Sequence, residues 1–265
     1  MLCRVLGVSR SGFYDWCVRA PDPARITLIG RMRRIHHRKR HSYGSRRMAA
    51  ALCTDTSRVG RDKARRLMRE AGIECRLRRR FRVTTDSEHS EYVATNHLNR
   101  CFSVARPDRV WVADITAIWA ASGWQYLAAV LDLYDRQIVG WALAGHMRTT
   151  LVASALQMAV GRRQPAPGLM HHSDRGCQYA SGDYRKLLRR HGMIASMSRR
   201  GNCWDNAVME RFFGSLKTEW LAGRSYPSAG ALRQDVIDYI ELEYNSDRPH
   251  FTLAMKTPRE MAAVA

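Results

Sequence analysis

Val110-Trp-Val-Ala-Asp-Ile-Thr-Ala-Ile118 is the stretch that decides the fold of this chain. It is an apolar run rich in β-branched residues, and two runs of the same character follow at Tyr126–Leu133 and Gln137–Leu143. Gly123 and the pair Asp135-Arg136 interrupt them, as turn residues do between strands. These features predict three consecutive strands in meander order.

The segments that follow alternate between helical and strand patterns. We predict a helix at 149–162, a strand at 168–172, a helix at 181–192, a strand at 194–197, and closing helices at 203–221 and 229–244. The order βββαβαβα predicts an α/β fold, in which a mixed five-stranded sheet carries helices on its faces.

The first quarter of the chain has helical periodicity instead. A short helical start at 7–18 is followed by predicted helices at 24–40, from Ser45 onward, and at 59–71, the last of which Gly72 ends. In the first of these three, the apolar positions expected to face a core are Ile26, Ile29, Met32 and Ile35.

The helix at 59–71 has two distinct faces. Its inward positions are expected to be Val59, Ala64, Leu67 and Met68, and its outward basic positions Arg61, Lys63, Arg65, Arg66 and Arg69. Three short helices with one arginine-rich face predict a small all-α unit of the helix-turn-helix type.

The composition points to a polyanionic partner. The 265 residues include 44 Lys and Arg against 24 Asp and Glu, a formal net charge of +20, and the pI is near 10.5. Residues 1–100 carry +15 of this excess and residues 101–265 only +5. We therefore expect residues 1–100 to provide most of the nucleic-acid binding. Residues 101–265 are expected to form a folded unit in which acidic residues are required for function.

The sequence does not favour a membrane-spanning protein or a zinc knuckle. No apolar stretch approaches the roughly 18 to 20 residues of a spanning helix, and the opening Met1-Leu-Cys-Arg begins no signal-peptide core. The seven cysteines are scattered, odd in number and without a Cys-x-x-Cys pair. We expect a cytoplasmic protein with reduced thiols, no disulfide framework and no zinc knuckle.

Asp114 is the first candidate catalytic acid. Metal-dependent phosphodiester chemistry requires carboxylates on rigid elements, and an isolated ionised group inside an apolar strand costs several kcal/mol unless it is paired or metal-bound. Asp114 lies in the middle of the first predicted strand. The alternative is that its side chain points to solvent from an edge strand.

Asp174 is the second candidate. It follows the strand Leu169-Met-His-His172 and precedes Gly176, and strand ends that feed glycine-containing loops are where α/β folds display functional side chains. The alternative is an ordinary turn residue. His171 and His172 fit either metal ligation or, more commonly, packing or DNA contact.

Glu210 is the third candidate. At about 100° per residue, Asn206, Glu210 and Lys217 fall within roughly 40° of one another on the helix at 203–221, beside an apolar packing face. The Glu can then meet a metal while the Lys reaches a phosphate. An ordinary amphipathic helix is the alternative. Asp205, just before Asn206, suits a helix cap.

The spacing of these acids resembles a known pattern. Fifty-nine residues separate Asp114 from Asp174, and 35 separate Asp174 from Glu210, which matches the D,D(35)E pattern of retroviral-integrase-like transposases. The longer motifs resemble the orfB product of IS-three family insertion sequences. They are Trp111-x-x-Asp-Ile-Thr116, Gly123-Trp-x-Tyr-Leu127, Asp132-Leu-x-x-Arg136, Ile138-Val-Gly-Trp141, His172-Ser-Asp-Arg-Gly-x-Gln-Tyr179, Asp205-Asn-Ala-x-x-Glu-x-Phe-Phe-x-x-Leu-Lys217, Tyr244-Asn-x-x-Arg-Pro-His250 and Thr257-Pro258, with Tyr43-Gly-x-Arg-Arg47 near the front.

The resemblance implies an RNase-H-like fold and a DNA transposase. It implies a helix-turn-helix-like region at 1–75, a basic linker at 76–105 and an integrase-type catalytic core with C-terminal helices at 106–265. It further implies that Asp114, Asp174 and Glu210 hold two Mg²⁺ or Mn²⁺ ions. The residues expected to contact DNA are Lys217, Asn206, Arg211, Arg46, Arg47, Arg61, Arg65, Arg66, Arg78, Arg79 and Arg80.

Partners and rival functions follow from the same resemblance. The expected partners are double-stranded DNA, as transposon ends and target, further copies of the chain, and the product of an upstream reading frame as fusion or partner. A bacterial, nucleoid-associated location is expected. The rival functions are a non-catalytic DNA-binding regulator of transposition and an RNase-H-like nuclease that hydrolyses without joining.

Overall fold

The structure is a computed structural model that describes residues 2–18, 22–54, 57–75, 93–199 and 203–264. The chain divides into two compact units, Met1–Arg76 and Leu77–Ala265. Each unit has its own hydrophobic core. Along the described stretches, no helix combines the length and the apolar character that crossing a bilayer demands.

The larger unit is built on the predicted mixed sheet. Its strands are β1 (Val110–Ala120), β2 (Gly123–Asp132), β3 (Ile138–Ala144), β4 (Met170–Ser173) and β5 (Ile194–Met197). They lie in the order β3-β2-β1-β4-β5. The first three form the antiparallel meander, and β4 and β5 run parallel to β1. The predicted fold class is confirmed.

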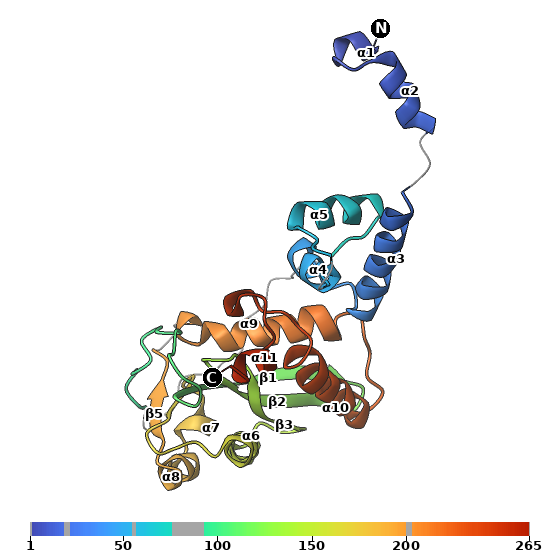
Figure 1. The fold of residues 1–265 in the computed structure, drawn as a ribbon. Coiled ribbons are helices and arrows are strands. Elements are labelled where there is room, and N and C mark those ends of the chain that lie inside the picture. Colours follow the sequence, from blue (N-terminus) through green and yellow to red (C-terminus); the bar gives the residue numbers. More distant parts are fainter. Residues whose placement is uncertain (1, 19–21, 55–56, 76–92, 200–202, 265) are drawn as a thin grey trace. The chain divides into compact units, whose positions relative to one another are not determined.

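Helices cover both faces of this sheet (Figure 1). One face packs against α9 (Ala207–Ser215) and α10 (Ala229–Ile237), and the other against α6 (Thr149–Arg163), α7 (Cys177–Ala180) and α8 (Gly182–Arg190). Side chains of β1 alternate between the two cores: Val112 belongs to the first, and Trp111 and Ala113 to the second. The central strand is therefore buried on both sides.

Gly140 sets how closely α6 approaches the sheet. A Cβ at this position of β3 would lie 2.2 Å from the carbonyl oxygen of Ala155 and 2.6 Å from the backbone nitrogen of Ala159. Only glycine permits that contact between a helix backbone and a strand. The glycine of the motif Ile138-Val-Gly-Trp141 is thus a packing residue.

The smaller unit contains α1 (Leu2–Val5), α2 (Arg10–Val18), α3 (Pro23–Arg38), α4 (Ser45–Leu52) and α5 (Arg61–Glu70). The helix α3 begins as its sequence favours, because the Asp22 carboxylate accepts a hydrogen bond from the Ala24 N–H at 2.9 Å and Pro23 occupies the first turn. The turn after α5 contains Gly72 at φ +65°, a conformation that glycine adopts without strain.

The predicted faces of α5 are confirmed. Val59, just before it, and Ala64, Leu67 and Met68 are buried in the core of this unit, and the predicted outward side chains Arg61, Lys63, Arg65, Arg66 and Arg69 are all exposed. The prediction for Ile26 is wrong, because its side chain is 58% exposed. On the helical wheel Ile26 points away from the stripe that contains Leu28, Met32 and Ile35.

Several short elements add to the predicted pattern. The two closing helices are composite: 3₁₀ turn η1 (Cys203–Asn206) precedes α9, π-helix η2 (Leu216–Leu221) follows it, and π-helix η3 (Asp238–Tyr244) follows α10. The chain ends with η4 (Phe251–Leu253) and α11 (Pro258–Ala262). Thr257 and Glu260 form a capping box that starts α11, a signal that the segment Thr257-Pro-Arg-Glu260 carries in its sequence.

Part of the predicted linker packs on the larger unit. Residues 76–92 lie outside the described residues. Ala94 and Leu98 are 8% and 3% exposed and belong to the cores on opposite faces of the sheet. The backbone N–H groups of His97 and Leu98 donate to the Ser196 hydroxyl of β5, at 2.9 and 3.3 Å. Residues from about 93 onward are therefore held by the sheet edge.

Candidate active site

The pairing of β1 with β4 brings two of the predicted acids together. The strands are parallel, and Ala113 is opposite Ser173. The next residue on each strand is an aspartate, Asp114 within β1 and Asp174 just beyond the end of β4. Adjacent parallel strands lie about 4.8 Å apart, so two residues 59 positions apart in sequence become neighbours.

The charges of the other two acids act on the Asp114 carboxyl. Its Oδ1 accepts a hydrogen bond from the Ile115 N–H at 2.8 Å. Burial raises the pKa of the Asp114 carboxyl well above its ordinary value, the charges of Asp174 and Glu210 raise it further, and the charge of Lys217 opposes them. Four of the predicted residues therefore share one electrostatic environment. A half-buried carboxyl held in this way is the pattern of a functional site.

Asp174 is held by the loop that follows it. Its Oδ1 accepts a hydrogen bond from the Gly176 N–H at 2.9 Å, so it makes an Asx-type turn, as the turn interpretation expected. This turn and its place beside Asp114 are compatible. The turn orients the carboxylate at the edge where β4 ends.

Glu210 reaches the same region from α9. The start of this helix is tied to β1, because the Asn206 amide donates to the Ala113 carbonyl at 3.2 Å. Glu210 follows one turn later and is exposed. Partial burial raises the pKa of its carboxyl. Among the described residues, no three His, Cys, Asp or Glu side chains are gathered tightly enough to hold a metal ion.

Lys217 lies in the π-helix η2, which continues α9. Burial lowers the pKa of its ammonium group and the nearby Asp114 charge raises it. Arg248 holds the π-helical turn in place. It donates to both carboxylate oxygens of Glu219, at 2.9 and 3.0 Å, and to the Ser215 hydroxyl at 3.0 Å. The arginine of the C-terminal motif thus supports the helix that carries Lys217.

Asp205 forms ion pairs with two arginines, and the prediction that it caps a helix is wrong. Arg199 donates to both of its oxygens, at 3.0 and 2.9 Å, and Arg100 and Asn96 donate at 2.9 Å each. The hydrogen bonds from Arg199 hold the pKa of Asp205 well below its ordinary value. Two arginines outcompete the helix N–H groups for this carboxylate, because charged donors bond more strongly.

His171 and His172 belong to the packing of β4. Both are buried, and burial lowers the pKa of the imidazoles to about 3 and about 4 respectively. His171 contacts the Tyr184 hydroxyl at 3.0 Å and His172 contacts the Ser196 hydroxyl at 2.9 Å. These neutral, enclosed rings favour the packing interpretation over DNA contact.

The predicted DNA-contacting residues occupy different environments. Arg61, Arg65 and Arg66 are exposed on α5, Arg46 is exposed on α4, and Arg211 is exposed on α9. The Arg47 guanidinium lies over the Tyr43 ring, 5.7 Å from its centroid. Asn206 is only 5% exposed, which gives it a part in the protein's own packing. Arg78, Arg79 and Arg80 lie outside the described residues.

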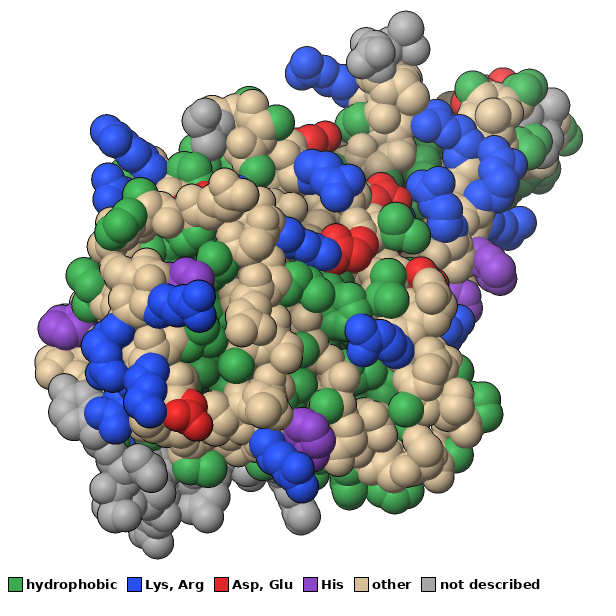
Figure 2. All heavy atoms as spheres, turned by 90° about the horizontal axis from the view of Figure 1, so that it is seen from below, with side chains coloured by type: hydrophobic (Ala, Val, Ile, Leu, Met, Phe, Trp, Pro, Cys, Tyr) green, Lys and Arg blue, Asp and Glu red, His purple; other side chains and the backbone are tan. Residues whose placement is uncertain are grey.

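Positive charge dominates the visible surface as well. Figure 2 shows Lys and Arg side chains spread across one face, where they outnumber the Asp and Glu side chains. Such a surface attracts a phosphate backbone and repels other polycations.

Tyr179 is a buried residue of this region to which the sequence patterns gave no role. It lies in α7, five residues after Asp174, and is 2% exposed. The charges of Asp114 and Asp174 both reach its hydroxyl. The signal available in the sequence was its place at the end of the motif that begins at His172.

Family models and known proteins match this chain over nearly its whole length. Models described as "Integrase core domain" match residues 104–203 and 191–258, and one described as "HTH-like domain" matches residues 24–81. The fold is also similar to a chain of the simian T-cell lymphotropic virus intasome solved with PP2A regulatory subunit B56 gamma. That similarity has a TM-score of 0.51 at 16% identity and covers 87% of this chain and 74% of that chain.

Closer relatives are insertion-sequence proteins. The insertion element IS600 uncharacterized 31 kDa protein of Shigella sonnei is 41% identical, over 97% of this chain and 96% of that protein. The transposase InsF for insertion sequence IS3A of Escherichia coli (strain K12) is 36% identical, over 94% of this chain and 88% of that protein. With an integrase core, a helix-turn-helix-like unit and this degree of identity, the chain belongs to the IS3 family of insertion-sequence transposases.

Proposed function

We propose that Asp114, Asp174 and Glu210 are the catalytic acids of this transposase, and that with Mg²⁺ or Mn²⁺ they cut DNA strands at the ends of an insertion sequence and join them to a target. One observation carries the proposal. The register of β1 and β4 makes Asp114 and Asp174 neighbours, in a place where Glu210 also acts on the Asp114 charge.

The donor set fits a hard divalent cation. Carboxylate oxygens are the ligands that Mg²⁺ and Mn²⁺ prefer. Like charges crowded into a partly buried space are costly when ionised, as the raised pKa of Asp114 indicates. Cation binding offsets that cost, so we expect metal affinity to rise with pH as the Asp114 carboxyl ionises.

Each residue has a distinct part in the proposed mechanism. The two aspartates bind from the rigid sheet, and Glu210 binds from α9, which Asn206 fastens to β1. When bound, two cations would activate the attacking water or DNA 3′-hydroxyl and stabilise the leaving 3′-oxygen. Lys217 holds a phosphate of the element end beside the acids, and Arg248 keeps the turn that carries it in place through Glu219.

The test replaces single acids without changing their size. Asp114→Asn and Glu210→Gln are each expected to lower Mg²⁺-dependent cleavage and joining about a thousandfold or more, while binding to element-end DNA stays at the wild-type level. Asp183→Asn is the matched control, because Asp183 is an exposed carboxylate, 87% accessible, on the same unit. A wild-type cleavage rate in either catalytic variant would refute the assignment.

The same assay separates the rival functions. Products joined into a second DNA molecule identify a strand-transfer enzyme, whereas cleavage without joining would indicate a nuclease. Binding without cleavage by the wild-type chain, with and without the upstream-frame product added, would indicate a regulator. Sedimentation of the chain with and without element-end DNA tests the predicted homo-oligomer on DNA.

A further inference from the structure

The Tyr179 hydroxyl is a buried polar group whose bonding is incomplete. Within the part of the chain that the structure describes, this oxygen has no hydrogen-bond partner, although the side chain is 2% exposed. A buried hydroxyl without a partner is costly, and such groups in folded proteins usually have a reason in function.

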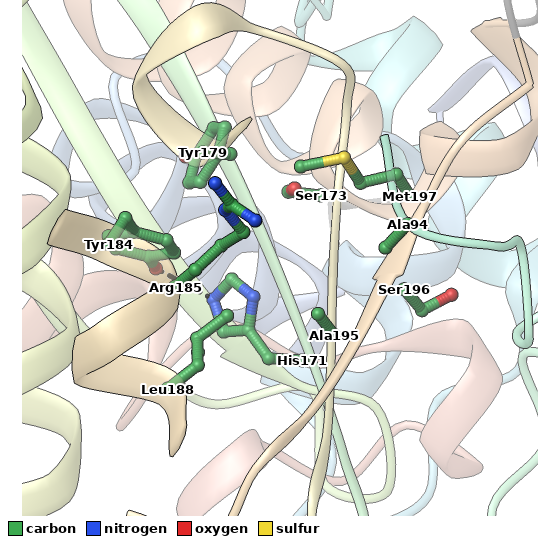
Figure 3. A pocket seen from close by; sticks show the side chains of 10 residues that line it. All are labelled: Ala94, His171, Ser173, Tyr179, Tyr184, Arg185, Leu188, Ala195, Ser196 and Met197. Carbon is green, nitrogen blue, oxygen red and sulfur yellow. Dashed lines mark hydrogen bonds between the residues drawn. The ribbon is translucent and has the colours of Figure 1, made fainter. Parts of the chain in front are cut away.

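The surroundings of the ring are well packed, so the hydroxyl is not misplaced by loose packing. The Tyr179 ring makes an edge contact with Tyr184, with centroids 5.4 Å apart, and lies 6.3 Å from the His171 ring. These rings border a small cavity with Ser173 and Arg185, shown in Figure 3. The cavity measures about 10 Å³, room for about one water molecule.

The neighbouring Tyr184 is a natural comparison. It is equally buried, 1% exposed, but its hydroxyl contacts the His171 Nε2 at 3.0 Å, the dashed line in Figure 3. Two tyrosines therefore line the same cavity. One hydroxyl completes a bond within the protein, and the other is within electrostatic reach of Asp114 and Asp174.

The Asp114 carboxylate can accept another bond. Its Oδ1 accepts the Ile115 N–H at 2.8 Å, and the Asp174 Oδ1 accepts the Gly176 N–H at 2.9 Å. A carboxylate has about four acceptor sites, so a further donor can be accommodated. A carboxylate that binds a metal commonly also accepts a hydrogen bond from a neighbouring donor, which orients it. Removing that donor typically costs about 10- to 100-fold in metal affinity or activity.

We propose that Tyr179 is a positioning residue for the catalytic aspartates: its hydroxyl donates a hydrogen bond to the Asp114 or Asp174 carboxylate when that carboxylate binds a divalent cation. The bond would fix the orientation of the acid, and it would satisfy the hydroxyl in the same state. The inference rests on the proposed function, since it needs these two acids to bind cations.

The experiment measures metal binding directly. Equilibrium binding of Mn²⁺ to the full chain is followed by the electron paramagnetic resonance signal of the free ion, for wild type, Tyr179→Phe, Tyr184→Phe and Asp114→Asn. Tyr179→Phe is expected to weaken Mn²⁺ binding about 10-fold. Tyr184→Phe is expected to leave it unchanged. In cleavage assays the Tyr179→Phe defect should be relieved by higher Mn²⁺ concentration, which shows as a changed metal requirement and a near-normal maximal rate.

A second measurement guards against a purely structural explanation. Without metal, Tyr179→Phe should unfold at the same or a higher urea concentration than wild type, because it removes an unsatisfied hydroxyl, whereas Tyr184→Phe should unfold at a lower one.

The outcomes separate the two proposals. If Asp114→Asn binds Mn²⁺ as tightly as wild type, the proposed metal site is wrong. If Asp114→Asn loses binding and Tyr179→Phe does not, only the role of Tyr179 is wrong, and a water molecule in the cavity would be the partner of its hydroxyl.

Discussion

Two groups of carboxylates lie beside the same sheet and differ in their partners. The proposed catalytic cluster, called the catalytic cluster below, is Asp114, Asp174 and Glu210. The paired cluster is Asp108, Asp132 and Asp135 with Arg163, gathered where β2 ends and α6 ends. Both clusters contain partly or fully buried acids, and both raise the pKa of at least one carboxyl.

The paired cluster contains an arginine and makes its hydrogen bonds within the protein. Asp135 accepts from the Arg163 guanidinium and from the Gln137 N–H at 2.8 Å. Asp132 accepts from the Tyr134 N–H at 2.7 Å and from the Trp111 indole at 3.2 Å. In both clusters two further acids raise the pKa of one carboxyl, that of Asp132 or that of Asp114, and at Asp114 the charge of Lys217 opposes them. The Arg163 ion pair supports a structural role for the paired cluster, whereas the proposed role of the catalytic cluster is to bind an external cation.

The largest expected effect is loss of the internal ion pair. Asp135→Asn should lower the free energy of unfolding of the larger unit by about 3 kcal/mol, because Arg163, only 19% exposed, loses the nearer of its two carboxylate ion-pair partners, Asp135 and Asp108. Urea unfolding followed by tryptophan fluorescence measures this. Asp183→Asn is the control on an exposed pair. A loss below about 1 kcal/mol would show that the paired cluster does not stabilise the fold.

A pH dependence of intermediate size is expected from Asp132. Burial, with the nearby Asp135 charge, raises the pKa of Asp132 to about 7. A carboxyl whose folded pKa is raised contributes stability that is fully present below its unfolded pKa, near 4, and is lost as pH rises through 7. Between pH 5 and 7 the unfolding free energy should fall by about 2 kcal/mol from this group.

Urea unfolding at several pH values, in an Asp114→Asn background, isolates that contribution from the catalytic cluster. Adding Asp132→Asn should flatten the fall between pH 5 and 7. Identical pH profiles with and without this second substitution would contradict the prediction.

The smallest expected effect is an increase in the free energy of unfolding. Asp114→Asn should raise the unfolding free energy at pH 7.5 by about 1 kcal/mol, or the Tm by roughly 3 °C, because it removes a partly buried charge that the other acids repel. Thermal unfolding without divalent metal is the measurement. A lower Tm would mean that the catalytic cluster, like the paired one, stabilises the fold.

Much of the larger unit was predictable from local patterns. The three apolar runs from Val110 onward contain enough β-branched and aromatic residues to predict the meander, and β5 lies at the residues expected for it. The faces of α5 followed from helical periodicity. The short α7 and the π-helical ends of the closing helices were missed, because one turn of helix and a change of helix type leave little periodicity to detect.

The partners of polar side chains were the least predictable feature. Asp205 looked like a helix cap because only its local neighbours were visible, but its bonds come from Arg199, Arg100 and Asn96. Ile26 was expected to be buried because the sequence does not say which part of a helical stripe another helix covers. Long-range contacts of this kind depend on how the elements pack.

By itself, the sequence determined the class of fold, the basic front unit and the identity of the three candidate acids, because hydrophobic period, charge and spacing are properties of the chain. Only the tertiary structure decided that Asp114 and Asp174 are neighbours, that Asn206 fastens α9 to β1, and that the Tyr179 hydroxyl is buried near both aspartates. Those facts arise from strand register and helix packing, which bring together residues that no local pattern connects.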